Sequence, residues 1–142
     1  NGIKQFVIDS VLMAGGQFCP PGLASIGIGG TFDSVARMAK EALLRPIGSH
    51  NPDPEVANLE EEMFAAINAT GIGPMGLGGD TTVFSCNIEY GVTHETQNPV
   101  ALNLQCWAHR KAGCRIQKNG DVEAIHNFGS DGFKLDGEEK DG

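Results

Sequence analysis

The stretch GGQFCPPGLASIGIGGT, residues 15–31, constrains the fold more than any other part of the sequence. Its two adjacent prolines fix their own backbone dihedrals and restrict the residue before them, so Cys19 must lie in a turn or an extended loop. The apolar run LASIGIG follows, and its length and composition predict a short buried strand. Glycines then free the backbone just before Thr31, which favours a helix start. The chain therefore presents a thiol in a stiff loop directly ahead of a strand and a helix.

The remaining segments predict an α/β fold, in which packed helices cover a mixed sheet. Helices are predicted at residues 3–14, 32–44 and 54–70, strands at 82–91 and 99–108, and a hairpin at 114–125. The first helix contains enough β-branched residues to leave a strand possible. The strand at 99–108 is nearly all apolar, which is typical of a strand buried on both faces. We expect one domain over residues 1–126 and an acidic, flexible tail over 127–142.

Composition excludes several classes of protein. The chain has 142 residues and a formal net charge of −8, which argues against nucleic-acid binding. No apolar run approaches the roughly 20 residues that span a bilayer, so no membrane partner is expected. The four cysteines form no C-x-x-C pair, which argues against a zinc finger. A chain of this size does not need disulfides for stability, which favours a reducing, cytoplasmic setting. The first residue, Asn1, is not methionine, which favours a fragment or a processed product.

Three features are candidates for chemistry. Cys19 is either a ligand held out by the prolines or a small buried hydrophobe. His94 lies in a polar loop, and Cys106 follows a strand, where the active-site residues of open sheets tend to lie. The two glycine clusters, IGIGGT and MGLGGDT, either hydrogen-bond a small anion through backbone N–H groups or form tight turns between packed elements.

Three blocks together resemble the α subunit of the class I fumarate hydratase and L-tartrate dehydratase family. These blocks are CPPGLASIGIGGTFDSVARMAKEALLRPIG, NATGIGPMGLGGDTT and THETQNPVALNLQCWAHRK. The resemblance runs from about Ile3 to about Ile125, and it makes the chain similar to the C-terminal portion of that iron–sulfur hydro-lyase α domain. AHRK stands where the family usually has two arginines.

The resemblance implies a [4Fe–4S] cluster held by three cysteines, with one iron left open to bind the substrate. Cys19 and Cys106 match two of the ligands, and the third would lie upstream of this chain. His94 matches a histidine that contacts a substrate carboxylate. Cys86 and Cys114 match no ligand and are expected to be structural. A β subunit or C-terminal domain would supply the rest of the site, within a homo- or hetero-oligomer.

We therefore expect part of a hydro-lyase that reversibly hydrates fumarate to (S)-malate. One alternative is an L-tartrate dehydratase α subunit, which forms oxaloacetate. Another, from a different class, is a non-catalytic binding or assembly module on the same scaffold. Under either enzyme hypothesis the chain alone should be inactive. The cluster hypothesis also expects Cys19, Cys106 and His94 to converge on one pocket.

Overall fold

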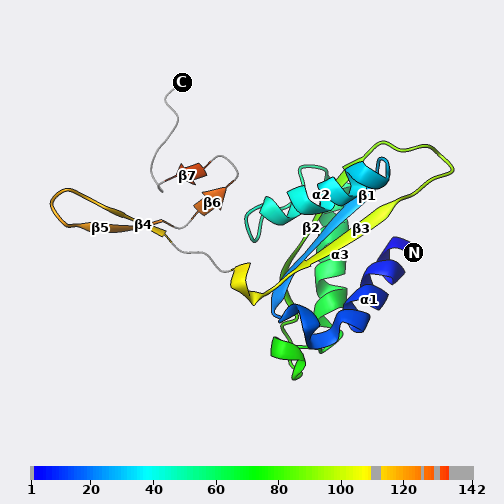
Figure 1. Ribbon diagram of the computed structural model, residues 1–142, viewed down its shortest axis with the longest axis horizontal. Coiled ribbons are helices and arrows are strands. Elements are labelled where there is room, and N and C mark those ends of the chain that lie inside the picture. Colours follow the sequence, from blue (N-terminus) through cyan, green and yellow to red (C-terminus); the bar gives the residue numbers. More distant parts are fainter. Residues whose placement is uncertain (1, 110–112, 126, 130–131, 135–142) are drawn as a thin grey trace.

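The computed structural model describes residues 2–109, 113–125, 127–129 and 132–134 (Figure 1). The main elements, in chain order, are α1 (Gly2–Ala14), η1 (Gly15–Phe18), β1 (Gly22–Gly29), α2 (Phe32–Leu44), α3 (Pro54–Asn68), η2 (Pro74–Gly76), β2 (Val83–Gly91), β3 (Val100–Gln105) and η3 (Trp107–His109). The predicted α/β class with a mixed sheet and packed helices is confirmed, and the first segment is a helix rather than a strand.

The central sheet has three strands in the order β2-β1-β3. β1 runs parallel to β2 and antiparallel to β3. Leu23 near the start of β1 lies opposite Gln105 at the end of β3. As a result, the end of β3 and the beginnings of β1 and β2 share one end of the sheet.

Helices cover both faces of this sheet (Figure 1). α2 packs on one face and contacts all three strands, whereas α3 packs against β2 on the other face, with α1 beside it. The α2 backbone approaches Gly27 so closely that a Cβ atom there would lie 2.2 Å from the carbonyl oxygen of Val35. Only glycine fits at such a distance, which explains its place in the middle of a buried strand.

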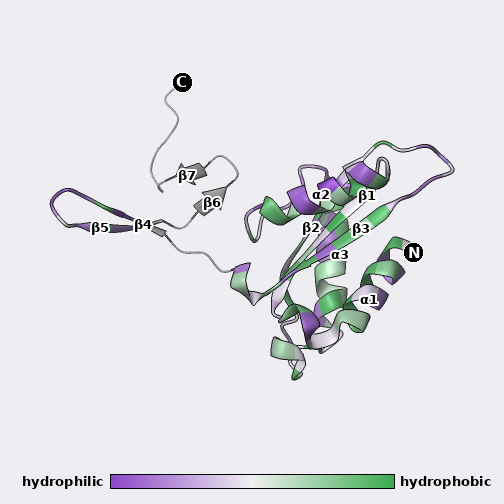
Figure 2. Cartoon of the chain, viewed as in Figure 1, coloured by the Kyte–Doolittle hydropathy of each residue, from purple (hydrophilic) through white to green (hydrophobic). Residues whose placement is uncertain are grey.

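The core lies between the sheet and the α1–α3 layer. Its buried members are Val7, Val11, Ala24, Ile26, Met63, Ile67, Val83, Cys86 and Ile88. Burial of such apolar surface is the main favourable contribution to folding. In contrast to this core, the outer turn of the connection between β2 and β3 has the hydrophilic colour in Figure 2.

The two predicted helix starts are confirmed. Thr31 and Ser34 form a capping box at the start of α2, in which each side chain bonds to the other residue's backbone. Asp53 accepts a hydrogen bond from the Glu55 N–H at 2.9 Å, and Pro54 occupies the first turn of α3. These partners satisfy backbone donors that the helix itself leaves free.

The prediction that the 99–108 strand is buried on both faces is wrong. β3 is an edge strand in which every residue is half-buried, and β1 is the fully enclosed strand. Because β3 is antiparallel, its carboxyl end meets the amino ends of the two parallel strands. Cys106 therefore does not lie at the carboxyl edge of a parallel sheet, as the strand pattern had suggested.

The predicted hairpin is confirmed as β4 (Gly113–Ile116) and β5 (Val122–Ile125). Its Asn119-Gly120 turn places Gly120 at φ +91°, a conformation that favours glycine. A shorter pair follows, β6 (Asn127–Gly129) with β7 (Gly132–Lys134), inside the segment predicted to be a tail. Residues 110–112 and 135–142 lie outside the described residues. No helix in the described part of the chain is long and apolar enough to cross a membrane.

Candidate functional site

Cys19 and Cys106 lie at the same end of the sheet. Cys19 precedes β1, and Cys106 directly follows β3, whose last residue lies opposite Leu23. The Trp107 N–H donates a hydrogen bond to the Cys19 carbonyl oxygen at 3.0 Å. The two cysteine loops, far apart in sequence, are therefore joined directly through their backbones.

The backbone at Cys19 has an unusual conformation. Its φ of 55° and ψ of 60° place it in the left-handed region, and its N–H donates to the Gly16 carbonyl oxygen at 3.1 Å. This region costs a residue with a side chain about 1–2 kcal/mol. The following Pro20–Pro21 peptide bond is cis. A left-handed conformation such as that of Cys19 persists only when its surroundings hold it, and it is found preferentially at functional sites.

The second glycine cluster supports the cysteine loop. The Met75 N–H donates to the Pro20 carbonyl oxygen at 2.6 Å. A Cβ atom at Gly76 would lie 2.7 Å from the Gly16 Cα, so the two backbones touch where no side chain fits. These contacts support the tight-packing interpretation of this cluster rather than anion binding.

An aromatic pair lies beside Cys106. The rings of Trp107 and Phe84 stack with centroids 5.9 Å apart and an interplanar angle of 29°. Stacked aromatic pairs add stability beyond the area they bury. Phe84 was not identified from the sequence, where the only signal was an aromatic residue early in a predicted strand.

The four cysteines differ in environment. Cys19 is exposed and Cys106 is half-buried, so both thiols are available to a ligand. Cys86 is buried, and this burial, together with the nearby Glu60 carboxylate, raises the pKa of its thiol to about 12. It fits the predicted structural role. Cys114 is exposed on β4, so the prediction of a structural role is not supported by burial.

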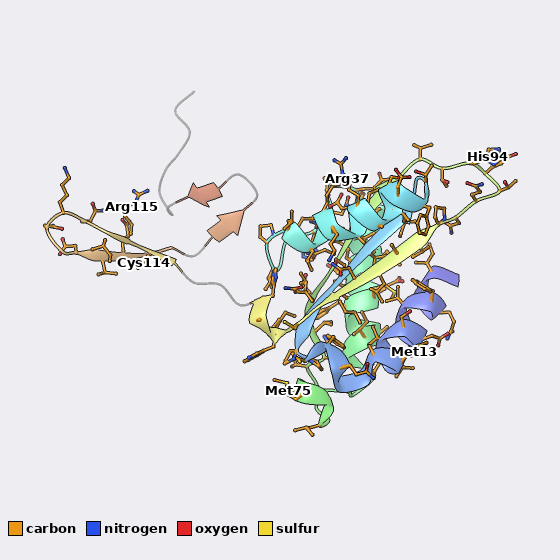
Figure 3. All side chains as sticks on the ribbon, in the orientation of Figure 1. Met13, Arg37, Met75, His94, Cys114 and Arg115 are labelled. Atoms are coloured by element: carbon orange, nitrogen blue, oxygen red, sulfur yellow. The ribbon has the colours of Figure 1, made fainter. Side chains whose placement is uncertain are left out.

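His94 lies at the opposite end of the sheet. It belongs to the connection between β2 and β3, which is tied to the end of β1 because the Thr93 hydroxyl donates to the Gly30 carbonyl oxygen at 2.9 Å. The first glycine cluster lies here too. Figure 3 shows His94 and Met75, which neighbours the Cys19 loop, at opposite extremes of the body. The six residues of β3 separate His94 from Cys106 by about 20 Å.

The structure therefore brings the two cysteines together but does not bring His94 to them. The His94 ring is exposed, and its Nδ1 accepts the Thr96 N–H at 3.2 Å. We assign the proton of the neutral ring to Nε2 on this basis. Nε2 can then donate a hydrogen bond to an acceptor such as a carboxylate.

A family model described as fumarate hydratase (fumerase) matches residues 1–115. The chain belongs to this family of iron–sulfur hydro-lyases. The match includes both cysteine loops and the His94 connection, and it confirms the family inferred from the three sequence blocks.

Curated relatives carry a more specific name. The putative L(+)-tartrate dehydratase subunit alpha of Methanocaldococcus jannaschii is 50% identical over 117 residues, which cover 82% of this chain and 41% of the relative. The L(+)-tartrate dehydratase subunit alpha of Escherichia coli K12 is 37% identical over 111 residues, which cover 78% of this chain and 37% of the relative. Its counterpart in strain UTI89 is 36% identical over 125 residues, which cover 88% of this chain and 41% of the relative. The chain thus spans about two fifths of the length of these relatives.

Two thiols fit part of the ligand set of the iron–sulfur cluster that membership of this family implies. Thiolates are the usual ligands of such clusters, and Cys19 and Cys106 are free and accessible. Within the described residues, no three or more cysteine, histidine or acidic side chains gather into a metal-binding group. A cluster held here therefore needs at least one ligand from outside the described part of the chain.

Proposed function

We propose that this chain is part of the α subunit of an iron–sulfur L(+)-tartrate dehydratase that acts in the cytoplasm. The observation that carries the proposal is the backbone bond between the Cys19 and Cys106 loops, in a chain 50% identical to a putative α subunit of that name. The names of the relatives favour tartrate over our sequence-based expectation of fumarate. Fumarate hydration is the second candidate, because the matching family model carries that description.

Cys19 and Cys106 would each bind one iron of the cluster, and a cysteine from another part of the protein would bind a third. When bound, the cluster supplies a Lewis acid at the substrate hydroxyl group. The left-handed turn at Cys19 and the cross-loop bond from Trp107 hold both ligand loops in place beforehand. Such preorganisation reduces the cost of assembling the site.

Trp107 and Phe84 would shield one side of this site. Trp107 directly follows Cys106 in the chain, and its ring stacks on that of Phe84. Excluding water strengthens the electrostatic interactions on which removal of a proton next to a carboxylate depends.

His94 is the part of the proposal that the geometry of this chain does not carry. Its assignment as a substrate-carboxylate donor rests on the resemblance and on its exposed ring, whose Nδ1 accepts the Thr96 N–H. About 20 Å of strand exceeds the length of a four-carbon dicarboxylate. A role for His94 therefore requires a second protomer, or a different course of residues 92–99 in the assembled enzyme.

A β subunit would complete the enzyme. The relatives are named as α subunits, which implies a β-subunit partner. The proton-transfer groups and further cationic residues would come from that partner, which agrees with an α chain of net charge −8 that acts on a dianion.

The test is a substrate comparison on the complete α/β enzyme, purified without oxygen. We expect a higher kcat/KM for dehydration of L(+)-tartrate than for hydration of fumarate, and no turnover of either substrate in a Cys106→Ser variant. Preferential turnover of fumarate would select the second candidate. A preparation that binds no iron would support the non-catalytic module instead.

A further inference from the structure

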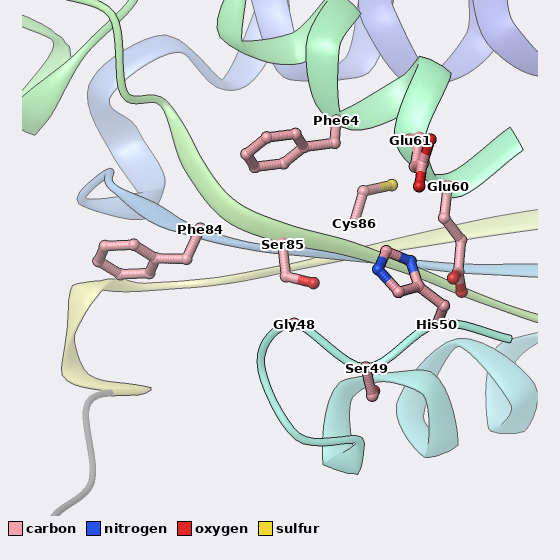
Figure 4. Close-up of a pocket in the computed structure, with 9 residues that line it drawn as sticks. All are labelled: Gly48, Ser49, His50, Glu60, Glu61, Phe64, Phe84, Ser85 and Cys86. Carbon is pink, nitrogen blue, oxygen red and sulfur yellow. The ribbon is translucent and has the colours of Figure 1, made fainter. Parts of the chain in front are cut away.

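A pocket of about 230 Å³ opens at the outer edge of β2, between α3 and residues 48–50 (Figure 4). Its lining residues are Gly48, Ser49, His50, Glu60, Glu61, Phe64, Phe84, Ser85 and Cys86. Figure 4 shows the Phe64 and Phe84 rings on one side of the opening and the His50 ring on the other. None of these residues belongs to the cysteine loops, although Phe84 is also part of the aromatic pair with Trp107.

Side chains cover the edge of β2 on both sides of this pocket. At Val83, the Asn68 side chain accepts the backbone N–H at 3.0 Å and donates to the carbonyl oxygen at 3.3 Å. At Ile88, the Glu60 carboxylate accepts the N–H at 2.7 Å, and the Asn51 amide donates to the carbonyl oxygen at 2.9 Å. Such covering satisfies backbone groups and blocks unwanted strand pairing.

Glu60 can do this because it is itself paired. Its side chain is only 2% exposed. The carboxylate accepts one hydrogen bond from the Arg45 guanidinium at 2.7 Å and another from the Asn51 N–H at 2.9 Å. A buried charge persists only with such partners. The cover at Ile88 is therefore a fixed part of the structure.

A gap remains at Cys86. In a strand, alternate residues direct their backbone groups to the same side, so Cys86 directs its N–H and carbonyl oxygen outward as Ile88 does. Among the described residues, no side chain hydrogen-bonds the Cys86 N–H or carbonyl oxygen. The gap opens into the pocket, which Cys86 lines. An occupant that offers one acceptor and one donor at the spacing of a backbone would complete the edge.

The pocket is suited to a single apolar side chain. Its volume lies below the range of about 300–1,000 Å³ that is typical of small-molecule sites. Phe64 and Phe84 give it apolar walls. Glu61 at the pocket disfavours an acidic occupant.

We propose that this pocket receives one large apolar side chain from an extended segment of the β subunit, whose backbone pairs with Cys86. Recognition of this kind combines main-chain hydrogen bonds with a side-chain pocket. Only the source of the segment rests on the proposed function. We choose the β subunit because Phe84, a wall of the pocket, stacks on Trp107 beside Cys106, where that subunit must close the site.

The chemistry is tested on the full chain without any cluster, with N-acetyl-phenylalanine N-methylamide as the probe. The probe carries one aromatic ring and one donor–acceptor backbone pair. We expect saturable nuclear magnetic resonance shifts of the Cys86 amide and the Phe64 ring at millimolar probe, and much smaller shifts with N-acetyl-alanine N-methylamide. The absence of saturable shifts with the phenylalanine probe would overturn the proposal.

Two variants and a matched control sharpen this test. Phe64→Ala removes a wall, Ser49→Phe fills the pocket, and each should weaken probe binding roughly tenfold or more. Phe6→Ala is the control, because Phe6 is 43% exposed, close to the 38% of Phe64, but lies on α1. Equal binding by all three variants and the unmodified chain would contradict the site.

The source is tested with a photo-cross-linking amino acid at position 64 in the assembled α/β complex. We expect cross-links to the β subunit. Cross-links exclusively to the α subunit or to a second α copy would overturn the choice of partner. This readout needs neither iron nor turnover, so its failure is distinguishable from failure of the proposed enzyme activity.

Discussion

The two ends of the sheet are built in different ways. At the cysteine end, loops meet backbone to backbone, through the Trp107 bond to Cys19 and the contact of Gly16 with Gly76. At the histidine end, a polar connection is exposed, and its His94 ring hydrogen-bonds Thr96 two residues away.

The difference shows where this chain determines geometry by itself. The cysteine loops are positioned by backbone contacts within this chain, and a side chain at Gly76 would disrupt one of them. Among the described residues, the hydrogen bonds of the His94 ring are local ones to Thr96, so its final position depends on whatever packs against it. The cysteine end should therefore govern cofactor content, and the histidine end should affect only substrate handling.

The largest effect is expected from losing a thiol. Cys19→Ser or Cys106→Ser should abolish iron and sulfide binding in the α subunit reconstituted without oxygen, because a hydroxyl is a poor cluster ligand. Iron and sulfide analysis measures this. Cys114→Ser is the matched control, since Cys114 is also exposed, and should retain the cluster. Full cluster content in Cys106→Ser would contradict the assignment of Cys106 as a cluster ligand.

A His94→Ala change should lower kcat/KM of the complete enzyme roughly a hundredfold, the usual effect of removing one donor to a developing charge. Iron content should stay the same, because the ring lies far from the cysteines. Steady-state kinetics beside iron analysis separates the two effects. Unchanged kinetics would mean that the separation seen in this chain persists in the enzyme and that His94 has no catalytic part.

The rigidity of the cysteine end can be tested through its glycines. Gly76→Ala should lower the free energy of unfolding by about 2–3 kcal/mol, from both a positive φ and a backbone clash. Gly78→Ala also has positive φ but no neighbour within 4 Å, so it should cost about 1 kcal/mol. Urea denaturation of both variants measures the difference. Equal losses would show that close packing contributes nothing there.

Cys19→Gly should raise the free energy of unfolding of the cluster-free protein by about 1 kcal/mol or less. Glycine relieves the left-handed strain, although its greater freedom in the unfolded chain offsets part of the gain. Cys106→Gly provides the control and should be destabilising, since no positive φ occurs at that residue. A Cys19→Gly protein less stable than its parent would indicate that the turn is not strained.

The smallest effect is expected at the histidine end, at the start of α2. Hydrogen bonds from the Thr31 hydroxyl, and then from backbone N–H groups, lower the pKa of Asp33 below its ordinary 3.8. A lowered pKa stabilises the fold above pH 3.8 and loses that contribution as the pH falls through the lowered value. Asp33→Asn should therefore be slightly less stable than the parent near neutral pH and equal to it in acid. If Asp33→Asn stayed less stable than the parent in acid, the loss of stability would come from the shape of the side chain rather than from its charge.

Much of the fold could be predicted from local sequence. Thr31 and the Asp53-Pro54 pair mark helix starts through chemistry that acts within a few residues, and Asn119-Gly120 marks a turn in the same way. The direction of β3 could not be predicted, because antiparallel pairing depends on contacts with β1, far away in sequence. The apolar run VALNL has the same composition in either direction.

The direction of β3 also decides which residues share one end of the sheet. A parallel β3 would have put Cys106 at the same end as His94 and the first glycine cluster, whereas the antiparallel strand puts it beside Cys19. The resemblance identified both cysteines by their motifs, with no information on direction. The edge cover by Glu60 and Asn68 was also missed, since a single polar residue on a helix gives no sign of what it meets across the core.

The bond from the Trp107 N–H to the Cys19 carbonyl oxygen involves no thiol and no metal. Because it does not depend on a bound cluster, it keeps the Cys19 and Cys106 loops in position without one. Under the proposed function, loss of the cluster would then leave both ligand loops in position. A new cluster would then need iron and sulfide but no refolding of the polypeptide around it.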